Sequence, residues 1–288
     1  MTVESPIDIE TLVFATENLQ FDSNSVLKGF IAYNQPHEHY RVTRSVDLSA
    51  FMPSMPPFPS NPPVDGPFTE HNVPLMGYLC VPADSCFANV GPFPLVLFQH
   101  GNNGTPVDVA PGYKYLCELL ASQGIIAASI AVCPLMAECE MPQWPKGAPR
   151  MAKRAIYTLE CLKQFRLWNS DVSHSLGGKI DLTRVMLVGH STSGRDIGLA
   201  SYINTLDSVQ GLPPEQGADY PWVELNNGEH NVGPYHFGIK AILSIEPSSP
   251  STYLHELPYG YHFSTDTVFR TRWQHDTANR VDPHKPYE

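Results

Sequence analysis

The length, composition and charge of the chain argue against several classes of protein. The chain has 288 residues, of which 42% are hydrophobic and 16% charged, so it can bury a large core and does not have the composition of a disordered protein. The formal net charge is −11 and the basic residues form no cluster, so we expect neither nucleic acid nor an anionic membrane surface as a partner. No apolar run is long enough to span a membrane, and the first residues lack the pattern of a signal peptide, which leaves a cytoplasmic location as the default expectation.

The first 70 residues are expected to form an N-terminal extension. Weak strand patterns occur at 11–14 and 40–47. His37 and His39 would point to the same side of an extended segment, but no third ligand lies nearby, so a solvated loop is the expected interpretation. Residues 52–67 are rich in proline and predict an extended surface loop.

From residue 71 to residue 288 the pattern predicts one domain in which strands alternate with helices. The strands are expected at 73–82, 94–99, 125–132, 185–188 and 239–245, and the helices at 112–123, 151–165 and 195–206. Such alternation is typical of a parallel sheet with helices on both faces. The predicted fold class is therefore α/β, a three-layer α/β/α sandwich with a mostly parallel sheet.

The six cysteines predict structural thiols and no metal site. Cys117 and Cys161 lie in apolar helical patterns, which is typical of buried thiols. The other four form two pairs that could each close a short loop if the protein were exported, Cys80 with Cys86 and Cys133 with Cys139. Neither spacing is that of a zinc or redox site. We expect no metal and no cofactor.

Candidate functional residues follow three of the predicted strands. A glycine-rich loop, residues 100–104, follows the strand at 94–99, Ser191 follows the strand at 185–188, and Glu246 ends the run at 239–245. In parallel sheets, functional groups gather at the carboxyl ends of the strands. A glycine-rich loop at such an end exposes backbone N–H groups that can bind an oxyanion.

Ser191 lies in a predicted sharp turn from strand to helix, Gly189-His190-Ser191-Thr192-Ser193-Gly194. A turn of this kind lifts a serine hydroxyl clear of the sheet, where it can act as a nucleophile. Gly189 lets the backbone pass close by, and the residue two positions after the serine must be small. That residue is Ser193 where the Gly-x-Ser-x-Gly pattern has glycine, so the turn is expected to be strained. The alternative interpretation is a structural turn serine.

These segments together resemble the α/β-hydrolase family, in its esterase and lipase branch. The most similar members are the dienelactone-hydrolase-like, polyester-hydrolase-like and platelet-activating-factor-acetylhydrolase-like esterases. The resemblance covers roughly residues 73–250 and rests on four segments, at 94–102, 119–125, 181–191 and 239–247. It implies a serine hydrolase that acts on a small-molecule ester or acyl substrate, with Ser191 as nucleophile. It also implies an oxyanion hole made by the backbone N–H groups of Asn102 and Thr192.

The acid and the histidine that the family requires have no clear counterparts. The family order is Ser, then Asp or Glu, then His. A predicted strand at 267–273 would make Asp276 the acid, and Glu246 is the alternative. His284 is the only histidine after Asp276, and no predicted strand precedes it. Three other histidines are available and nothing in the sequence distinguishes them: His255, His262 and His275.

The chain is therefore expected to lack the last strand–loop–helix unit of the family. Three explanations stay open: a truncated gene product, a non-catalytic binding protein on the same scaffold, or a variant with a rebuilt C-terminus. A missing final strand would leave an open apolar border on the sheet. The substrate and the oligomeric state cannot be read from the sequence.

Overall fold

The computed structural model describes the central sheet, its helices and several of the loops that join them. The described residues are 9–13, 44–52, 69–82, 91–101, 110–132, 135, 150–211, 221–225 and 232–247. Several predicted features lie outside these residues: the histidines at 37 and 39, the proline-rich segment from 53 onward, Cys86, Cys133, Cys139, Asn102, the strand at 267–273, Asp276 and His284.

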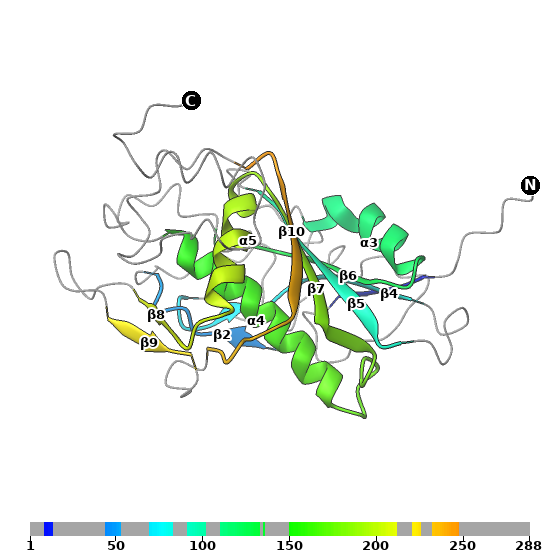
Figure 1. Cartoon of the computed structure of the whole chain (residues 1–288), viewed down its shortest axis with the longest axis horizontal. Coiled ribbons are helices and arrows are strands. Elements are labelled where there is room, and N and C mark those ends of the chain that lie inside the picture. Colours follow the sequence, from blue (N-terminus) through cyan, green and yellow to red (C-terminus); the bar gives the residue numbers. More distant parts are fainter. Residues whose placement is uncertain are drawn as a thin grey trace, which may run out of the picture.

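A six-stranded mixed sheet forms the centre of the molecule (Figure 1). In spatial order, its strands are β1 (Ile9–Val13), β4 (Gly77–Pro82), β6 (Ile126–Ile130), β5 (Phe93–Gln99), β7 (Ile180–His190) and β10 (Ile239–Ile245). β4 is antiparallel to β1 and to β6, whereas β6, β5, β7 and β10 are parallel to one another. The predicted α/β class is confirmed.

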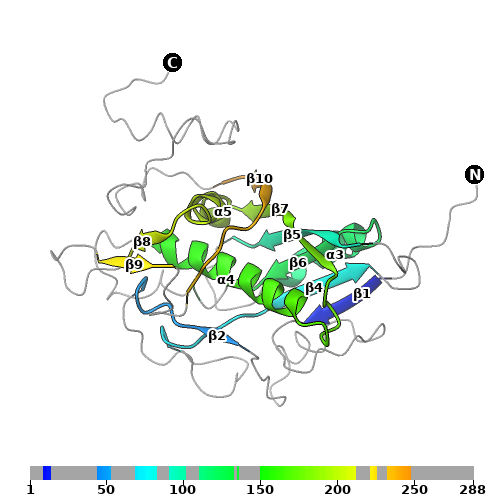
Figure 2. The same ribbon diagram turned by 60° about the horizontal axis from the view of Figure 1, so that its bottom comes forward.

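The helices follow strands along the chain. They are α3 (Lys114–Ala121), α4 (Arg150–Ser170) and α5 (Thr192–Ile203). A short 3-10 helix, η1 (Ala110–Tyr113), precedes α3. Figure 1 shows α3 on one side of the sheet and α4 and α5 on the other. Two small antiparallel sheets lie at the periphery, β2 (Ser45–Val46) with β3 (Val73–Pro74) and β8 (Ser208–Gln210) with β9 (Trp222–Glu224). Figure 2 shows β2, β8 and β9 on the side of the sheet where α4 lies.

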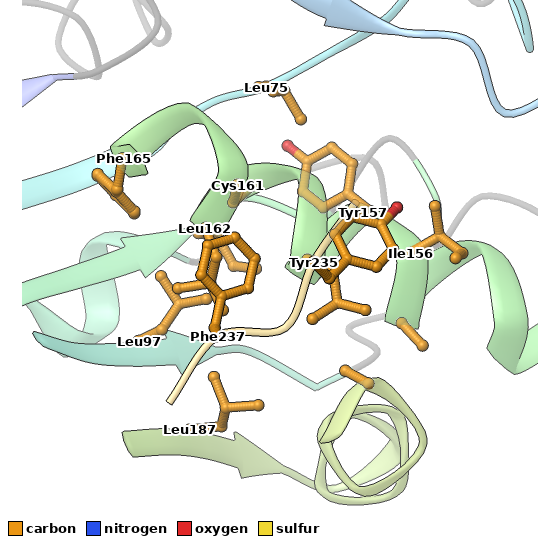
Figure 3. Packing of buried hydrophobic residues seen from close by; sticks show 14 of the residues in the cluster. Leu75, Leu97, Ile156, Tyr157, Cys161, Leu162, Phe165, Leu187, Tyr235 and Phe237 are labelled. Carbon is orange, nitrogen blue, oxygen red and sulfur yellow. The ribbon is translucent and has the colours of Figure 1, made fainter. Parts of the chain in front are cut away.

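Alternate residues of the central strands enter two different hydrophobic clusters. Leu95 and Leu97 of β5 belong to the larger cluster, which includes α4 and α5, while Val96 and Phe98 belong to the cluster on the side of α3. Figure 3 shows part of the larger cluster, where Leu97 packs near side chains of α4 and of the segment before β10. Burial on both faces explains why the inner strands are continuous apolar runs in the sequence.

β7 begins earlier than the sequence predicts. Pro94 of β5 pairs with Asp181, but the next residue, Leu95, pairs with Val185, so residues 182–184 bulge out of the ladder. The Asp181 carboxylate accepts hydrogen bonds from the N–H and the hydroxyl of Thr183. The strand continues through this local turn, but the polar residues of the turn interrupt its apolar sequence pattern.

Residues from the predicted N-terminal extension take part in the sheet and the core. β1 pairs with β4 along its whole length and forms one border of the described sheet. Leu48, Phe51 and Met52 are fully buried. The division of the chain at residue 70 stays a prediction, but the core is built from both sides of it.

The described cysteines are buried thiols. Cys117 and Cys161 are fully buried thiols, as predicted, and Cys80 is fully buried as well. Burial raises the pKa of Cys161 well above its usual value, which keeps it protonated and unreactive. Within the described part of the chain, no helix combines the length and the apolar character that crossing a membrane requires.

Candidate active site

The carboxyl ends of three parallel strands meet at one edge of the sheet. The last residue of β5 lies opposite Gly189 of β7, and the last residue of β10 lies opposite His190. The segments that follow these strands, which contain Gly101, Ser191 and Glu246, therefore leave the sheet at the same level. The sequence predicts these residues at strand ends, and in the structure they follow β5, β7 and β10.

Ser191 occupies a strained backbone conformation between β7 and α5. Its φ is 56° and its ψ is −123°, a region that residues with a side chain rarely adopt. The N–H of Ser191 donates to the carbonyl of Ile245 at 3.0 Å, and its own carbonyl accepts from the N–H of Gly194 at 3.0 Å. Conformations of this kind cost about 1–3 kcal/mol and cluster at functional sites. The neighbouring strand and helix hold this one in place.

The tight turn depends on small residues. A Cβ added to Gly189 would overlap the carbonyl of Ser193, and one added to Gly194 would lie 3.1 Å from Cβ of Pro247, just beyond β10. The requirement for glycine two positions before the serine is therefore steric, as predicted.

Ser193, which departs from the family pattern, has a defined role in the turn. Its side chain is fully buried, and its hydroxyl donates a hydrogen bond to the carbonyl of His100. The turn thus accepts a serine here because the hydroxyl has a buried acceptor. The bond joins the start of α5 to the loop after β5.

That loop approaches Ser191 closely. A Cβ added to Gly101 would lie 2.8 Å from Cβ of Ser191 and 3.0 Å from the carbonyl oxygen of His190. Only glycine allows the backbone to come this near. The next residue, Asn102, is the predicted oxyanion donor and lies outside the described residues.

His100 is a structural histidine. The N–H of Val132 donates to its Nε2 at 3.0 Å, so the proton of the neutral ring is on Nδ1, which donates to the carbonyl of Gly101 at 2.9 Å. Burial lowers the pKa of His100 to about 4, the positive charge of Arg154 acts in the same direction, and the bond to Gly101 opposes them. Both ring nitrogens are occupied, so His100 is not a base for Ser191.

The remaining candidates differ in how the structure places them. Thr192 is the first residue of α5, so its N–H lies at the positive end of the helix dipole. Glu246 lies just beyond β10, exposed, with a φ of 43°. His190 is exposed beside Ser191. Within the described ranges, no hydrogen bond joins Oγ of Ser191 to a histidine.

A buried charged cluster near the turn is absent from the sequence-based prediction. It consists of Gln99 at the end of β5, Arg154 and Thr158 of α4, and Asp196 of α5, and we call it the Asp196 cluster. Both helices bury further polar residues, among them Glu160 and Arg195, so the sequence alone does not distinguish Asp196 and Arg154 from their neighbours.

Comparison with protein-family models gives no match, and comparison with curated proteins gives none either. Solved structures that match include esterase B from Lactobacillus rhamnosis HN001, with 18% identity, a TM-score of 0.35, and coverage of 60% of this chain and 42% of that chain. Esterase B inhibited with a C4-C4 SN3 tributyrin phosphonate matches with 15% identity, a TM-score of 0.34, and coverage of 60% and 43%. This chain thus spans less than half the length of those proteins.

Proposed function

We propose that the protein is a serine hydrolase that cleaves carboxylic esters through an acyl-enzyme on Ser191. The observation that carries the proposal is the backbone of Ser191, strained at a φ of 56° at the carboxyl end of β7 and approached by Gly101. A structural turn would be served by glycine at no conformational cost, whereas a nucleophile needs a side chain at this position.

The arrangement of the elements supports the same proposal. We also propose that residues 71–288 form an α/β-hydrolase domain and that its fold is a three-layer α/β/α sandwich. Support for the three layers is that α3 lies on one side of the sheet and α4 and α5 on the other (Figure 1). The loop after β5 and the start of α5 are the segments from which such hydrolases draw their oxyanion donors.

In the proposed reaction, Oγ of Ser191 attacks the ester carbonyl while a base accepts its proton. The oxyanion that forms is stabilised by the N–H groups of Thr192 and Asn102, and the loss of one such donor typically costs about 3 kcal/mol. The alcohol then leaves with a proton, and water hydrolyses the acyl-enzyme.

The proposed base is His284, and the acid that orients it is Asp276 or Glu246. Support for Glu246 comes from its position at the edge of the sheet where Ser191 lies and from its positive φ, which is rare outside functional sites and turns. Support for Asp276 comes only from the family order.

The nucleophile is tested with p-nitrophenyl acetate and butyrate and with a fluorophosphonate probe. Wild type is expected to hydrolyse both esters and to be labelled once, and Ser191→Ala to lose both properties. Ser201→Ala, on the same helix, is the matched control and should behave like wild type. Equal hydrolysis and labelling of wild type and Ser191→Ala would rule out Ser191 as the nucleophile.

The acid and the base are tested with His284→Asn, Asp276→Asn and Glu246→Gln. Loss of the acid in a serine triad lowers kcat by up to about 10⁴-fold. The correct acid is the one whose amide variant shows a loss of this order, with the other close to wild type. If His284→Asn retains full activity, the base is another residue.

A second candidate function is a non-catalytic binding protein on this scaffold. The specific observation in its favour is that, among the described residues, no imidazole is hydrogen-bonded to Oγ of Ser191. A wild-type protein that is folded by circular dichroism but neither hydrolyses the esters nor reacts with the probe would favour this function over the first.

A further inference from the structure

The Asp196 cluster connects three elements that converge on the candidate active site. Nε of Arg154 lies 2.6 Å from Oδ2 of Asp196, and its NH2 group lies 3.1 Å from Oδ1, so the guanidinium binds the carboxylate with two parallel bonds. Gln99 donates from Nε2 to Oδ2 of Asp196 at 3.4 Å and accepts at Oε1 from the hydroxyl of Thr158 at 2.5 Å. All four side chains are buried.

Each member of the cluster is close in sequence to a part of the site or to the helix that supports it. Asp196 lies early in α5, the helix that begins directly after Ser191, and Gln99 directly precedes His100 and Gly101. Arg154 and Thr158 lie on one face of α4, which packs beside α5. Asp196 is therefore tied to α4 through Arg154 and to the end of β5 through Gln99, which Thr158 of α4 also holds, so the cluster links the base of the nucleophile turn to the base of the loop after β5.

Stability alone does not explain a charged cluster in this place. A buried ion pair is often no more stable than apolar residues of the same size, because both charges must be removed from water. What two parallel bonds between a guanidinium and a carboxylate do provide is a fixed relative orientation. A nucleophile and an oxyanion loop need such an orientation, since a displacement of about 1 Å can lower a rate about 100-fold.

We propose that Arg154, Asp196 and Gln99 are positioning residues that fix the nucleophile turn of Ser191 relative to the oxyanion loop at Gly101. The proposal rests on the proposed hydrolase function. The residues do not touch the substrate and act through the elements that carry them.

The molecule contains a matched control for this role. Glu160, which lies on α4 like Arg154, is as buried as Asp196 and binds NH2 of Arg44 at 2.6 Å. It also accepts from the N–H of Gly233 at 2.9 Å and from the hydroxyl of Tyr235 at 3.0 Å. None of these partners belongs to the nucleophile turn or to the loop after β5.

The experiment compares Asp196→Asn with Glu160→Gln in the full chain. For each variant, kcat and KM for p-nitrophenyl butyrate and the rate constant of fluorophosphonate labelling are measured at a temperature where urea titration shows full folding. We expect Asp196→Asn to lower kcat and the labelling rate about 10- to 100-fold, with KM changed less than about twofold. Glu160→Gln should lower the midpoint of unfolding while kcat stays within about twofold of wild type.

Two further variants keep the proposal falsifiable if Asp196→Asn does not fold. Gln99→Met removes only the hydrogen bonds of the amide, and is expected to lower kcat about tenfold. The double variant Arg154→Met with Asp196→Leu removes both charges and should recover stability, as apolar replacements of buried ion pairs often do, but not kcat. Recovery of both stability and kcat would show that the cluster is only structural.

The outcomes separate the two proposals. Wild type that is not labelled at Ser191 overturns the hydrolase function and this inference together. Wild type that is labelled, with kcat of Asp196→Asn and Gln99→Met equal to wild type, overturns this inference and leaves the hydrolase function standing.

Discussion

Two buried carboxylates, Asp196 and Glu160, each bind an arginine but connect different parts of the molecule. Both are fully excluded from solvent, and both bind an arginine at 2.6 Å. Asp196 lies in the helix that follows Ser191. One of its partners, Gln99, ends the strand before the loop that approaches Ser191, and the other, Arg154, lies on α4. The partners of Glu160, by contrast, lead to the start of β2 and to the segment before β10.

The carboxylate of Glu160 stabilises the segment before β10, which contains Gly233, Tyr235 and Phe237. Arg166 of α4 donates to the carbonyl of Tyr235 at 2.7 Å and lies 4.6 Å above the ring of Phe237. Figure 3 shows Tyr235 and Phe237 packed against side chains of α4. Burial, the charge of Glu160 and its hydrogen bond raise the pKa of the Tyr235 hydroxyl well above its usual value, so it stays protonated and donates to that carboxylate. The same kind of contact, a buried carboxylate on an arginine, is thus found beside the candidate site in one place and in the scaffold in another.

The largest effect is expected at the site, from Gly101→Ala. The added Cβ would lie 2.8 Å from Cβ of Ser191, so the loop and the turn must move apart. We expect kcat/KM to fall about 10²- to 10³-fold, the usual loss when one oxyanion donor is displaced. Gly112→Ala is the control, because its Cβ would meet no atom within 4 Å. Full activity of Gly101→Ala would contradict the close approach.

The matching substitution near Glu160, away from the candidate site, is Gly233→Ala; the N–H of Gly233 donates to the Glu160 carboxylate. Gly233 has a φ of 68°, and an added Cβ would overlap the carbonyl of Leu225. We expect the free energy of unfolding, measured with urea, to fall by about 3 kcal/mol, with kcat per folded molecule unchanged. Gly178→Ala has a similar φ of 70° but open space around it, so it should cost only about 1 kcal/mol. An equal loss of unfolding free energy in Gly233→Ala and Gly178→Ala would show that the backbone moves to relieve the overlap with the carbonyl of Leu225.

A pH dependence is expected from His100, whose pKa in the folded protein is about 4 against 6.5 for an unperturbed ring. Because the unfolded chain binds the proton more tightly, the stability from His100 is fully present above pH 6.5 and is lost as pH falls toward 4. The loss amounts to about 3 kcal/mol. It is measured as the difference between wild type and His100→Gln in urea titrations at several pH values. Parallel pH profiles of the two proteins would refute it.

The smallest effect is expected from Ser193→Ala, which removes the hydrogen bond to the carbonyl of His100. A neutral bond of this kind contributes about 1 kcal/mol to the free energy of unfolding. Since the Asp196 cluster holds the same two segments, kcat should fall by no more than about threefold. Ser201→Ala on the same helix is the control. A larger loss of kcat than in Asp196→Asn would assign the positioning role to Ser193 instead.

The predictable parts of the fold are those with a strong local pattern. The apolar runs of β5, β6 and β10 and the amphipathic pattern of α4 were sufficient for their positions to within a few residues. The start of β7 was not predictable, because the bulge beside Asp181 places polar residues inside a strand. β1 and β2 correspond to the weak strand patterns at 11–14 and 40–47, and the patterns are weak because both strands are short.

The candidate site, like the fold, has parts that are predictable from a local pattern and parts that are not. The turn around Ser191 is visible in the sequence because its glycines and its strand-to-helix change lie within a few residues. Asp196 and Arg154 were not identified, since charges in helices are usually on the solvated face and the two lie far apart along the chain. Asp276 and His284 stay predictions.

The apolar run at 185–188 and Gly189 are enough to place Ser191 where a buried strand turns into a helix, because they dictate that geometry locally. The charged residues beneath this turn are brought there by the packing of distant segments. Their burial depends on the packing of α4 against α5 and on the end of β5, and a single sequence contains no local signal for contacts between such distant segments.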